Sequence, residues 1–185
     1  MSVNGKGGAS IFKIAVYGAA VFLLAVFQSS VAPRFPFFGT TPVYLLALTA
    51  AAAFFDGENT GAVVGLAAGF FADALGGVGI SVLPIFYTLL GWTVGRFAAK
   101  LGHSRSTAIS EKLGRWAVWL LAACGFGMLI TLVCLLLSAG KVHIFSVFLR
   151  LLLPEAVGTF LFGYPIGIIF IIIYRKRIFD RYERN

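Results

Sequence analysis

Charged side chains are scarce in this chain. Asp, Glu, Lys and Arg together make up 12% of its 185 residues, about half of the roughly 25% that a soluble domain carries. Apolar types make up 59%, and Phe and Gly are abundant, with 19 and 22 copies. A surface so poor in charge is unsuited to facing water on every side. This composition excludes an ordinary soluble fold and is typical of membrane helices, in which Gly is common.

Motifs for nucleophilic or phosphate chemistry are also missing. The sequence has no glycine-rich loop that ends in Lys-Ser or Lys-Thr, and no Gly-x-Ser-x-Gly elbow. Its two histidines, His103 and His143, fall on opposite predicted sides of a membrane. Cys124 and Cys134 lie on one predicted helix, too far apart for a disulfide or a shared metal. We therefore expect no enzyme activity, no metal and no cofactor.

The net charge of +8 would also suit a nucleic-acid-binding protein. In this sequence, however, the basic residues stand at the ends of apolar segments instead of along one surface. Nucleic acid is therefore not an expected partner, whereas contact of the basic C-terminal segment with anionic lipid headgroups is expected.

Apolar segments recur along the whole chain and predict an all-α bundle of about six membrane-spanning helices in one domain, 1–185. The first and fifth segments have the roughly 20 residues that cross the hydrocarbon, whereas the second and third are short at about 15. The first segment could also be a signal peptide, but no small-residue cleavage site follows it. A further interfacial helix is predicted at 144–153. The expected spans are 11–31, 42–55, 61–75, 82–99, 116–138 and 154–174.

Lysine and arginine are unequally divided between the two sides of this arrangement. Because cytoplasmic loops are enriched in basic residues, the division predicts that both chain ends are cytoplasmic. A five-span arrangement would place one basic cluster outside and is disfavoured. Only Arg34, Lys141 and Arg150 fall outside. The cytoplasmic set is Lys6, Lys13, Arg96, Lys100, Arg105, Lys112, Arg115, Arg175, Lys176, Arg177, Arg181 and Arg184.

Two acidic residues fall inside or close to apolar segments. Asp73 lies near the outer end of the third predicted span, and Glu155 follows Pro154 in the first turn of the sixth. Ionisable residues within a membrane are costly and are candidates for function, although a helix dipole also favours a carboxylate in a first turn. Three roles remain open: local structure, contact with a helix or partner, and handling of protons or substrate.

Small residues form the most regular pattern in the sequence. A glycine at every fourth position stays on one face of a helix and lets another backbone approach closely. Such a face suits either packing within the bundle or docking of a partner's transmembrane helix. The third span carries Gly61, Gly65 and Gly69, with Asp73 continuing the spacing; the fourth carries Gly91 and Gly95, and the sixth Gly163 and Gly167.

A wider set of positions, spread over the chain from Gln28 onward, resembles a known family. The set consists of Gln28, Pro33, Asp56, Gly57, Gly61, Gly65, Gly69, Asp73, Gly76, Gly79, Tyr87, Gly91, Pro154 and Glu155. In these positions, and in size and span number, the sequence is similar to the MreD family of bacterial rod-shape-determining membrane proteins. The stretch 101–142 carries no part of the resemblance.

The resemblance implies a non-enzymatic scaffold of the bacterial inner membrane. MreD proteins bind MreC, which has one transmembrane helix and a periplasmic domain. Through MreC they act with the MreB filament and with peptidoglycan synthases to control rod shape and peptidoglycan synthesis. We expect the glycine stripe, or the loops beside Asp56 and Asp73, to dock MreC. Leucine at Gly65 or Gly69 would then weaken the complex without affecting insertion.

The resemblance also implies a fold similar to the substrate-binding subunits of energy-coupling-factor vitamin transporters. This similarity supplies an alternative function, namely small-molecule binding in such a transporter. An Ala15-x-x-x-Ala19 pair resembles that family's contact with its energising partner. Against this alternative, a vitamin pocket has several convergent polar groups, and the predicted outer loops offer few.

Overall fold

The computed structural model describes residues 5–36, 38–76, 82–100, 109–139 and 148–182. Within these ranges the protein is all-helical and contains no β-strand, which confirms the all-α part of the predicted fold class. The α-helices are α1 (Gly5–Val26), α2 (Tyr44–Asp56), α3 (Glu58–Gly76), α4 (Leu83–Lys100), α5 (Ile109–Ala139) and α7 (Leu153–Tyr182). Short π-helices follow α1 (η1, Phe27–Val31) and precede α7 (η4, Phe148–Leu152), and a 3-10 turn (η2, Ala32–Arg34) follows η1.

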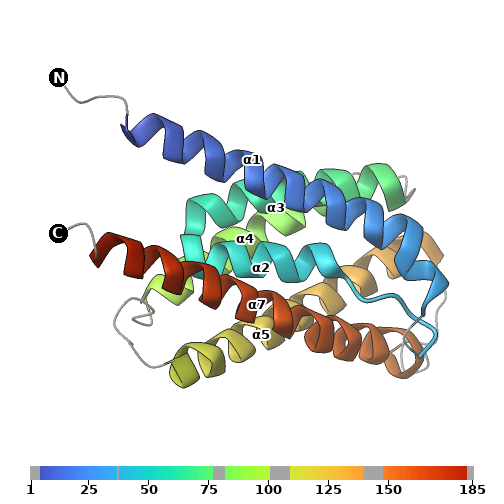
Figure 1. Ribbon diagram of the computed structural model, residues 1–185. Coiled ribbons are helices and arrows are strands. Elements are labelled where there is room, and N and C mark those ends of the chain that lie inside the picture. The colour runs from blue at the N-terminus through green and yellow to red at the C-terminus, as the bar shows by residue number, and fades with distance from the viewer. Residues whose placement is uncertain (1–4, 37, 77–81, 101–108, 140–147, 183–185) are drawn as a thin grey trace.

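The six α-helices run lengthwise along one bundle and alternate in direction (Figure 1). α1 begins and α7 ends at the same end of the bundle, which we call the termini end. The connection from α2 to α3 lies there too, and η1 and η2 lie at the opposite end, which we call the far end. The outer ends of the first and last described helices thus lie at one end of the bundle.

Among the residues that the structure describes, three segments are long and apolar enough to cross a membrane: Lys13–Arg34, Glu111–Val133 and Phe148–Ile172. These segments correspond to the first, fifth and sixth predicted spans. Helix α2 is apolar but has only 13 residues, about 20 Å of helix. Helices α3 and α4 have 19 and 18 residues but do not reach the same hydropathy. By length and composition alone, the structure therefore supports three of the six spans.

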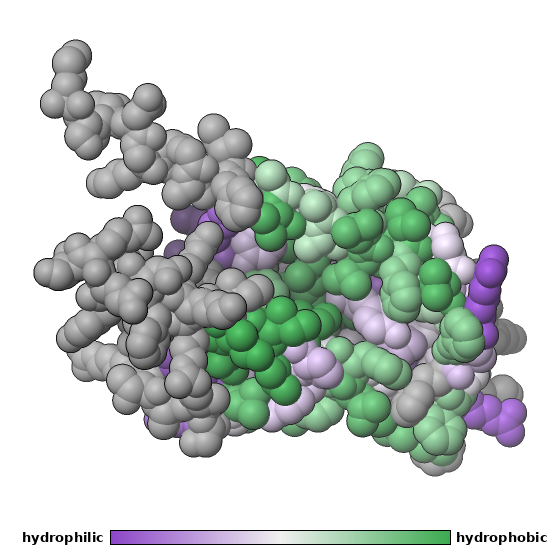
Figure 2. All heavy atoms as spheres, viewed as in Figure 1, coloured by the Kyte–Doolittle hydropathy of each residue, from purple (hydrophilic) through white to green (hydrophobic). Residues whose placement is uncertain are grey.

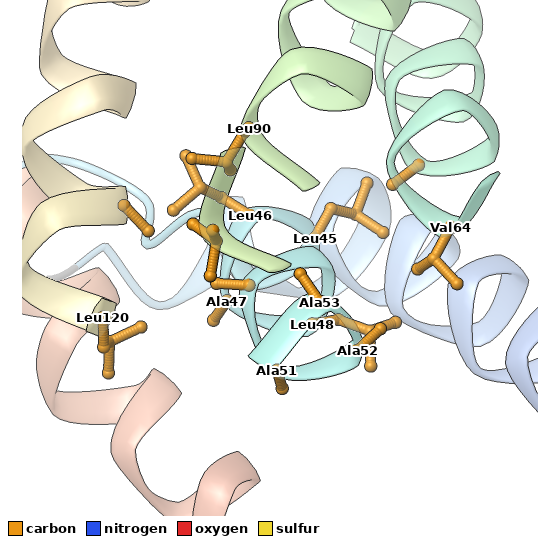
Figure 3. Close-up of a cluster of buried hydrophobic side chains, with 14 of the residues drawn as sticks. Leu45, Leu46, Ala47, Leu48, Ala51, Ala52, Ala53, Val64, Leu90 and Leu120 are labelled. Carbon is orange, nitrogen blue, oxygen red and sulfur yellow. The ribbon is translucent and has the colours of Figure 1, made fainter. Parts of the chain in front are cut away.

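Helix α2 is the centre of the bundle. All ten residues from Leu45 to Phe54 are buried, and each of the other five α-helices contacts α2. Figure 3 shows its leucine and alanine side chains meeting Val64 of α3, Leu90 of α4 and Leu120 of α5. Because four consecutive alanines, Ala50 to Ala53, have no exposed surface, neighbouring helices approach the axis of α2 closely. The core therefore surrounds a slim helix.

Several helix bounds differ from the predicted ones. The polar turn expected at 56–60 is reduced to Gly57, whose φ of 91° is accessible to glycine at little cost. Helix α3 consequently starts at Glu58 instead of Gly61, and its first turn contains a carboxylate that the helix dipole favours. Helix α5 starts seven residues before the predicted 116. The predicted interfacial helix at 144–153 is described only from Phe148, as η4 leading directly into α7.

The exterior of the bundle is largely apolar. Figure 2 shows hydrophobic residues across the middle of the face in view, with hydrophilic residues toward the two ends. The exposed residues include large side chains on every α-helix except α2, such as Leu23, Leu66, Leu89, Leu121 and Leu161. A soluble protein rarely exposes so much contiguous apolar surface. This exterior is suited to contact with lipid.

Candidate functional site

The glycines of α3 and α4 face each other and form the most extensive helix contact in the protein. A Cβ added at Gly69 would lie 2.6 Å from the Leu83 carbonyl oxygen, and one at Gly95 would lie 2.5 Å from Glu58 Cα. Such distances are too short for a real side chain, so the two backbones touch. We call this contact the glycine seam. It also includes Gly61 against Gly91 and Gly65 against the Tyr87 carbonyl.

The glycine seam decides between the two interpretations of the repeat on α3. Because α4 occupies the face that carries Gly61, Gly65 and Gly69, this face has no open surface for a second protein. The pattern on α3 therefore serves packing within the bundle. A Cβ at Gly65 would overlap the backbone of α4, so a leucine there would disturb the bundle itself as well as any partner contact.

Glycines on α7 pack in a different way. A Cβ at Gly163 would meet Ala47 Cβ at 2.8 Å and Leu120 Cδ1 at 3.1 Å, and one at Gly167 would overlap the ring of Trp116. Trp116 is fully buried and donates a 3.4 Å hydrogen bond from Nε1 to the Tyr164 carbonyl. These glycines therefore accommodate side chains of α2 and α5 and not a helix backbone.

At the termini end, Asp56 connects α2 to α1. Lys13 Nζ lies 2.6 Å from Asp56 Oδ1, and the Tyr17 hydroxyl donates a hydrogen bond to Asp56 Oδ2. The Asp56 side chain is only 5% exposed, and Lys13 is 34% exposed. A carboxylate so enclosed requires a charged partner. Asp56, one of the family-like positions, therefore holds the first helix against the core.

At the far end, two side chains from other helices cap α2. The amide of Leu45 donates a 3.1 Å hydrogen bond to Gln28 Oε1 of η1, and the amide of Val43 donates a 2.9 Å hydrogen bond to Thr159 Oγ1 of α7. The first amides of a helix have no partner within it, so both bonds satisfy groups that the helix leaves open. The N-cap residue of α2, Val43, has no side-chain capping bond of its own.

A pocket of about 350 Å³ opens beside Gln28 at the far end. It lies between η1, η2, the start of α2 and the last turns of α3. We call it the far-end pocket, and its lining is Ala25, Gln28, Ser29, Pro33, Thr41, Leu45, Phe71, Ala72 and Leu75. The pocket joins the family-like positions Gln28 and Pro33 to the part of α3 that carries Asp73 and Gly76. Gly79, a further family-like position, is outside the described residues.

The two acids singled out from the sequence both face protein. Glu155 accepts a 3.5 Å hydrogen bond from Thr131 Oγ1 of α5. Both carboxylate oxygens of Asp73 are enclosed and have no hydrogen-bond partner among the described residues. The backbone of Leu83 lies nearby. Tyr87, a further family-like position, is buried on α4. The three residues belong to three different helices, α3, α4 and α7.

The interior near these acids is tightly filled. The space beside Glu155, bounded by Cys124, Met128 and Thr159, is about 10 Å³, enough for one water molecule at most. Arg150 is exposed, and neither acid makes an ion pair in the described ranges. Nor do those ranges contain three or more His, Cys, Asp or Glu side chains placed to hold a metal ion. The space beside Glu155 is therefore too small for a ligand larger than water.

The sequence did not indicate three of the residues that organise these sites. Lys13 was counted among the cytoplasmic basic residues, and Tyr17 and Thr159 had no assigned role. Their partners lie far away in the chain, and single residues among apolar neighbours give no signal of a distant contact. Comparison with known proteins adds no assignment, because no protein-family model, no curated protein and no solved structure matches this chain.

Proposed function

We propose that this protein is a six-span scaffold of the bacterial inner membrane that binds MreC in the cell-elongation machinery. The observation that carries the proposal is the far-end pocket, which Gln28 and Pro33 line beside the last turns of α3. These are positions at which the sequence resembles the MreD family. Their presence together at one open site is expected of a shared binding surface.

The topology supports the proposal. Six helices of alternating direction, with α1 starting where α7 ends, match a chain that crosses a membrane six times. The shorter helices α2, α3 and α4 are surrounded or paired within the bundle, so they need less hydropathy than a helix exposed to lipid. The excess of basic residues assigns the termini end to the cytoplasm. The far-end pocket then opens toward the periplasm.

The position of the pocket suits MreC. MreC crosses the membrane once and continues into a periplasmic domain, so the segment that leaves the membrane passes the level of η1 and η2. Apolar side chains of that segment would enter beside Phe71 and Leu75, and its backbone would meet the polar groups of Ser29 and Thr41. A pocket that mixes apolar walls with a few polar groups is typical of a specific site.

The test is recovery of MreC by the tagged protein from gently solubilised membranes. Ser29 and Leu75 are exposed at the pocket, so Ser29→Trp and Leu75→Trp would fill it without disturbing the core. Leu121, 58% exposed on α5, provides the control Leu121→Trp. We expect the pocket variants to recover several-fold less MreC than the control. Failure of the unaltered protein to recover MreC would overturn the proposal.

A second function, small-molecule binding in an energy-coupling-factor type transporter, is favoured by one observation. The far-end pocket, at about 350 Å³, falls within the size range of small-molecule sites. Saturable binding of a vitamin by the purified protein, lost in Leu75→Trp, would support this function. Recovery of an ATPase pair and a coupling subunit instead of MreC would establish it in place of the scaffold.

A further inference from the structure

A second open site lies at the other end of the molecule, between α1 and α3. A groove of about 380 Å³ separates these two helices, which run in the same direction (Figure 1). Gly18 forms part of its floor, and a Cβ added there would meet nothing within 4 Å. Ile14 and Val63, 68% and 65% exposed, form its two rims. The groove is therefore open along its side, where lipid would lie.

The groove is polar at one end and apolar along the rest of its length. Lys13 of α1 and Asn59 and Thr60 of α3 lie at the termini end. Farther from the termini end, the residues of both helices that line the groove are mostly apolar, and the last of them are Val21 on α1 and Ala67 on α3. Val21 follows Lys13 by eight positions on α1, and Ala67 follows Asn59 by eight positions on α3. At the rise of an α-helix, eight positions make the groove about 12 Å long. This length is close to the roughly 15 Å of one leaflet.

The groove ends before the ring pair of Phe22 and Phe71. Its last lining residues are Val21 and Ala67, and beyond them the rings of Phe22 on α1 and Phe71 on α3 lie 5.9 Å apart between centroids. A partner's transmembrane helix would need a surface that continues through both leaflets, and this pair interrupts it. An acyl chain that enters from one leaflet needs only the part of the groove that precedes Phe22. The length and the closed end both fit a lipid.

The polar end presents hydrogen-bond donors. The Asp56 carboxylate that pairs with Lys13 is only 5% exposed, whereas Lys13 is 34% exposed, so the ammonium group is the part of the pair that a ligand can reach. An ammonium carries three donors and no acceptor. The Asn59 amide and the Thr60 hydroxyl add further donors beside it. A phosphate group offers matching acceptors and the opposite charge.

We propose that the groove between α1 and α3 binds one anionic glycerophospholipid of the leaflet at the termini end. Its phosphate would meet Lys13, Asn59 and Thr60, and one acyl chain would lie over Gly18 against Val21 and Val64. The site is separate from the far-end pocket. Lipid binding in the groove depends on the membrane topology proposed above but not on MreC binding. The lipid proposal and the MreC proposal can therefore fail independently of each other.

The test is native mass spectrometry of the delipidated full chain, titrated with phosphatidylglycerol. Gly18→Leu fills the groove without overlapping protein, because nothing lies within 4 Å of its added Cβ. The matched control is Gly125→Leu, on the exposed face of α5, where an added Cβ also meets nothing. Displacing about two methylene groups from the groove corresponds to a roughly tenfold loss of affinity. We expect that loss for the first phosphatidylglycerol in Gly18→Leu, and no change in Gly125→Leu.

A headgroup variant makes the assignment sharper. Asn59→Leu, at an exposed position, should reduce the preference for phosphatidylglycerol over phosphatidylcholine several-fold. Monodispersity and thermal melting of the variant test whether it is folded. Equal phosphatidylglycerol affinity in Gly18→Leu and Gly125→Leu would overturn the proposal. Loss of MreC recovery in Gly18→Leu with unchanged lipid binding would overturn it too, and would assign the groove to a partner helix.

Discussion

Helix α3 meets two neighbours in opposite ways. On one face, Gly61, Gly65 and Gly69 bring its backbone against α4 with no intervening side chains. On another face, Val63 and Ala67 stand across a groove from α1. The first contact is continuous backbone packing, whereas at the second the rings of Phe22 and Phe71 pair beside the groove. The Lys13–Asp56 ion pair next to it ties α1 to α2 and not to α3. The comparison shows that glycine spacing marks the close backbone contact, and that α1 is held by a few polar and aromatic groups.

The largest expected effect comes from breaking the glycine seam. Gly65→Leu places a side chain where the Tyr87 carbonyl lies, so α3 and α4 must separate. We expect a loss of about 3 kcal/mol or more, or a melting temperature lower by roughly 6–12 °C. Thermal unfolding in detergent, followed by circular dichroism, measures it. Gly18→Leu on α1 is the control and should melt like the unaltered protein. Equal melting of both variants would show that the seam is not rigid.

The next effect comes from separating α1 from Asp56. Lys13→Met leaves an enclosed carboxylate without its cation, and loss of one partner of a fully buried pair costs about 3–5 kcal/mol. Because Lys13 is one-third exposed, solvent screening lowers this to about 2 kcal/mol. The double variant Lys13→Met with Asp56→Asn should regain most of the stability. Equal melting temperatures for the single and double variants would contradict the role of the pair.

Uncapping α2 should have a smaller effect. Gln28→Leu removes the acceptor for the Leu45 amide, and leaving a buried donor unpaired costs about 1–3 kcal/mol. Thr159→Val removes the acceptor for the Val43 amide and should cost a similar amount. Because different amides are involved, the two losses should add in the double variant. A double variant no less stable than either single one would mean that one bond replaces the other.

The smallest effect is expected at the surface of the glycine seam. Arg96 NH1 lies 3.6 Å from Glu58 Oε2, and both side chains are more than one-third exposed. Exposed pairs of this kind contribute about 0–1 kcal/mol, so Arg96→Gln should barely change the melting temperature. It is also the charge-removal control for Lys13→Met. A loss as large as that of Lys13→Met would show that the seam, too, depends on an ion pair.

Much of the fold follows from apolar runs and glycine spacing. The runs predicted each described α-helix, and the repeat on α3 predicted a face for close packing. The repeat could not identify α4 as the neighbour, because a small-residue face suits any helix that approaches it. The turn before α3 was predicted to span residues 56–60, because these are four polar residues and a glycine. In the structure Gly57 alone, with its positive φ, reverses the chain.

The candidate sites were less predictable. Gln28 and Pro33 were noted because of a resemblance, but the pocket beside them requires η1, α2 and α3 to meet. Lys13 and Asp56 are each ordinary near a membrane surface, and only the folded bundle shows that they form a pair. Asp73 and Glu155 were noted as ionisable residues in apolar segments, and their role stays a prediction. The contact of Glu155 with Thr131 of α5 depends on a helix arrangement that no local pattern contains.

The burial of α2 has a consequence for biogenesis. A helix of about 20 Å, enclosed on all sides, has neither the length nor the exposed surface to be held in a bilayer by itself. The translocation machinery reads segments largely by their own hydrophobicity as they emerge. Helix α2 would therefore be retained only together with its neighbours, as a hairpin with α3 or after α4 has been made. Assembly of the bundle and insertion of its centre would then be one event during synthesis.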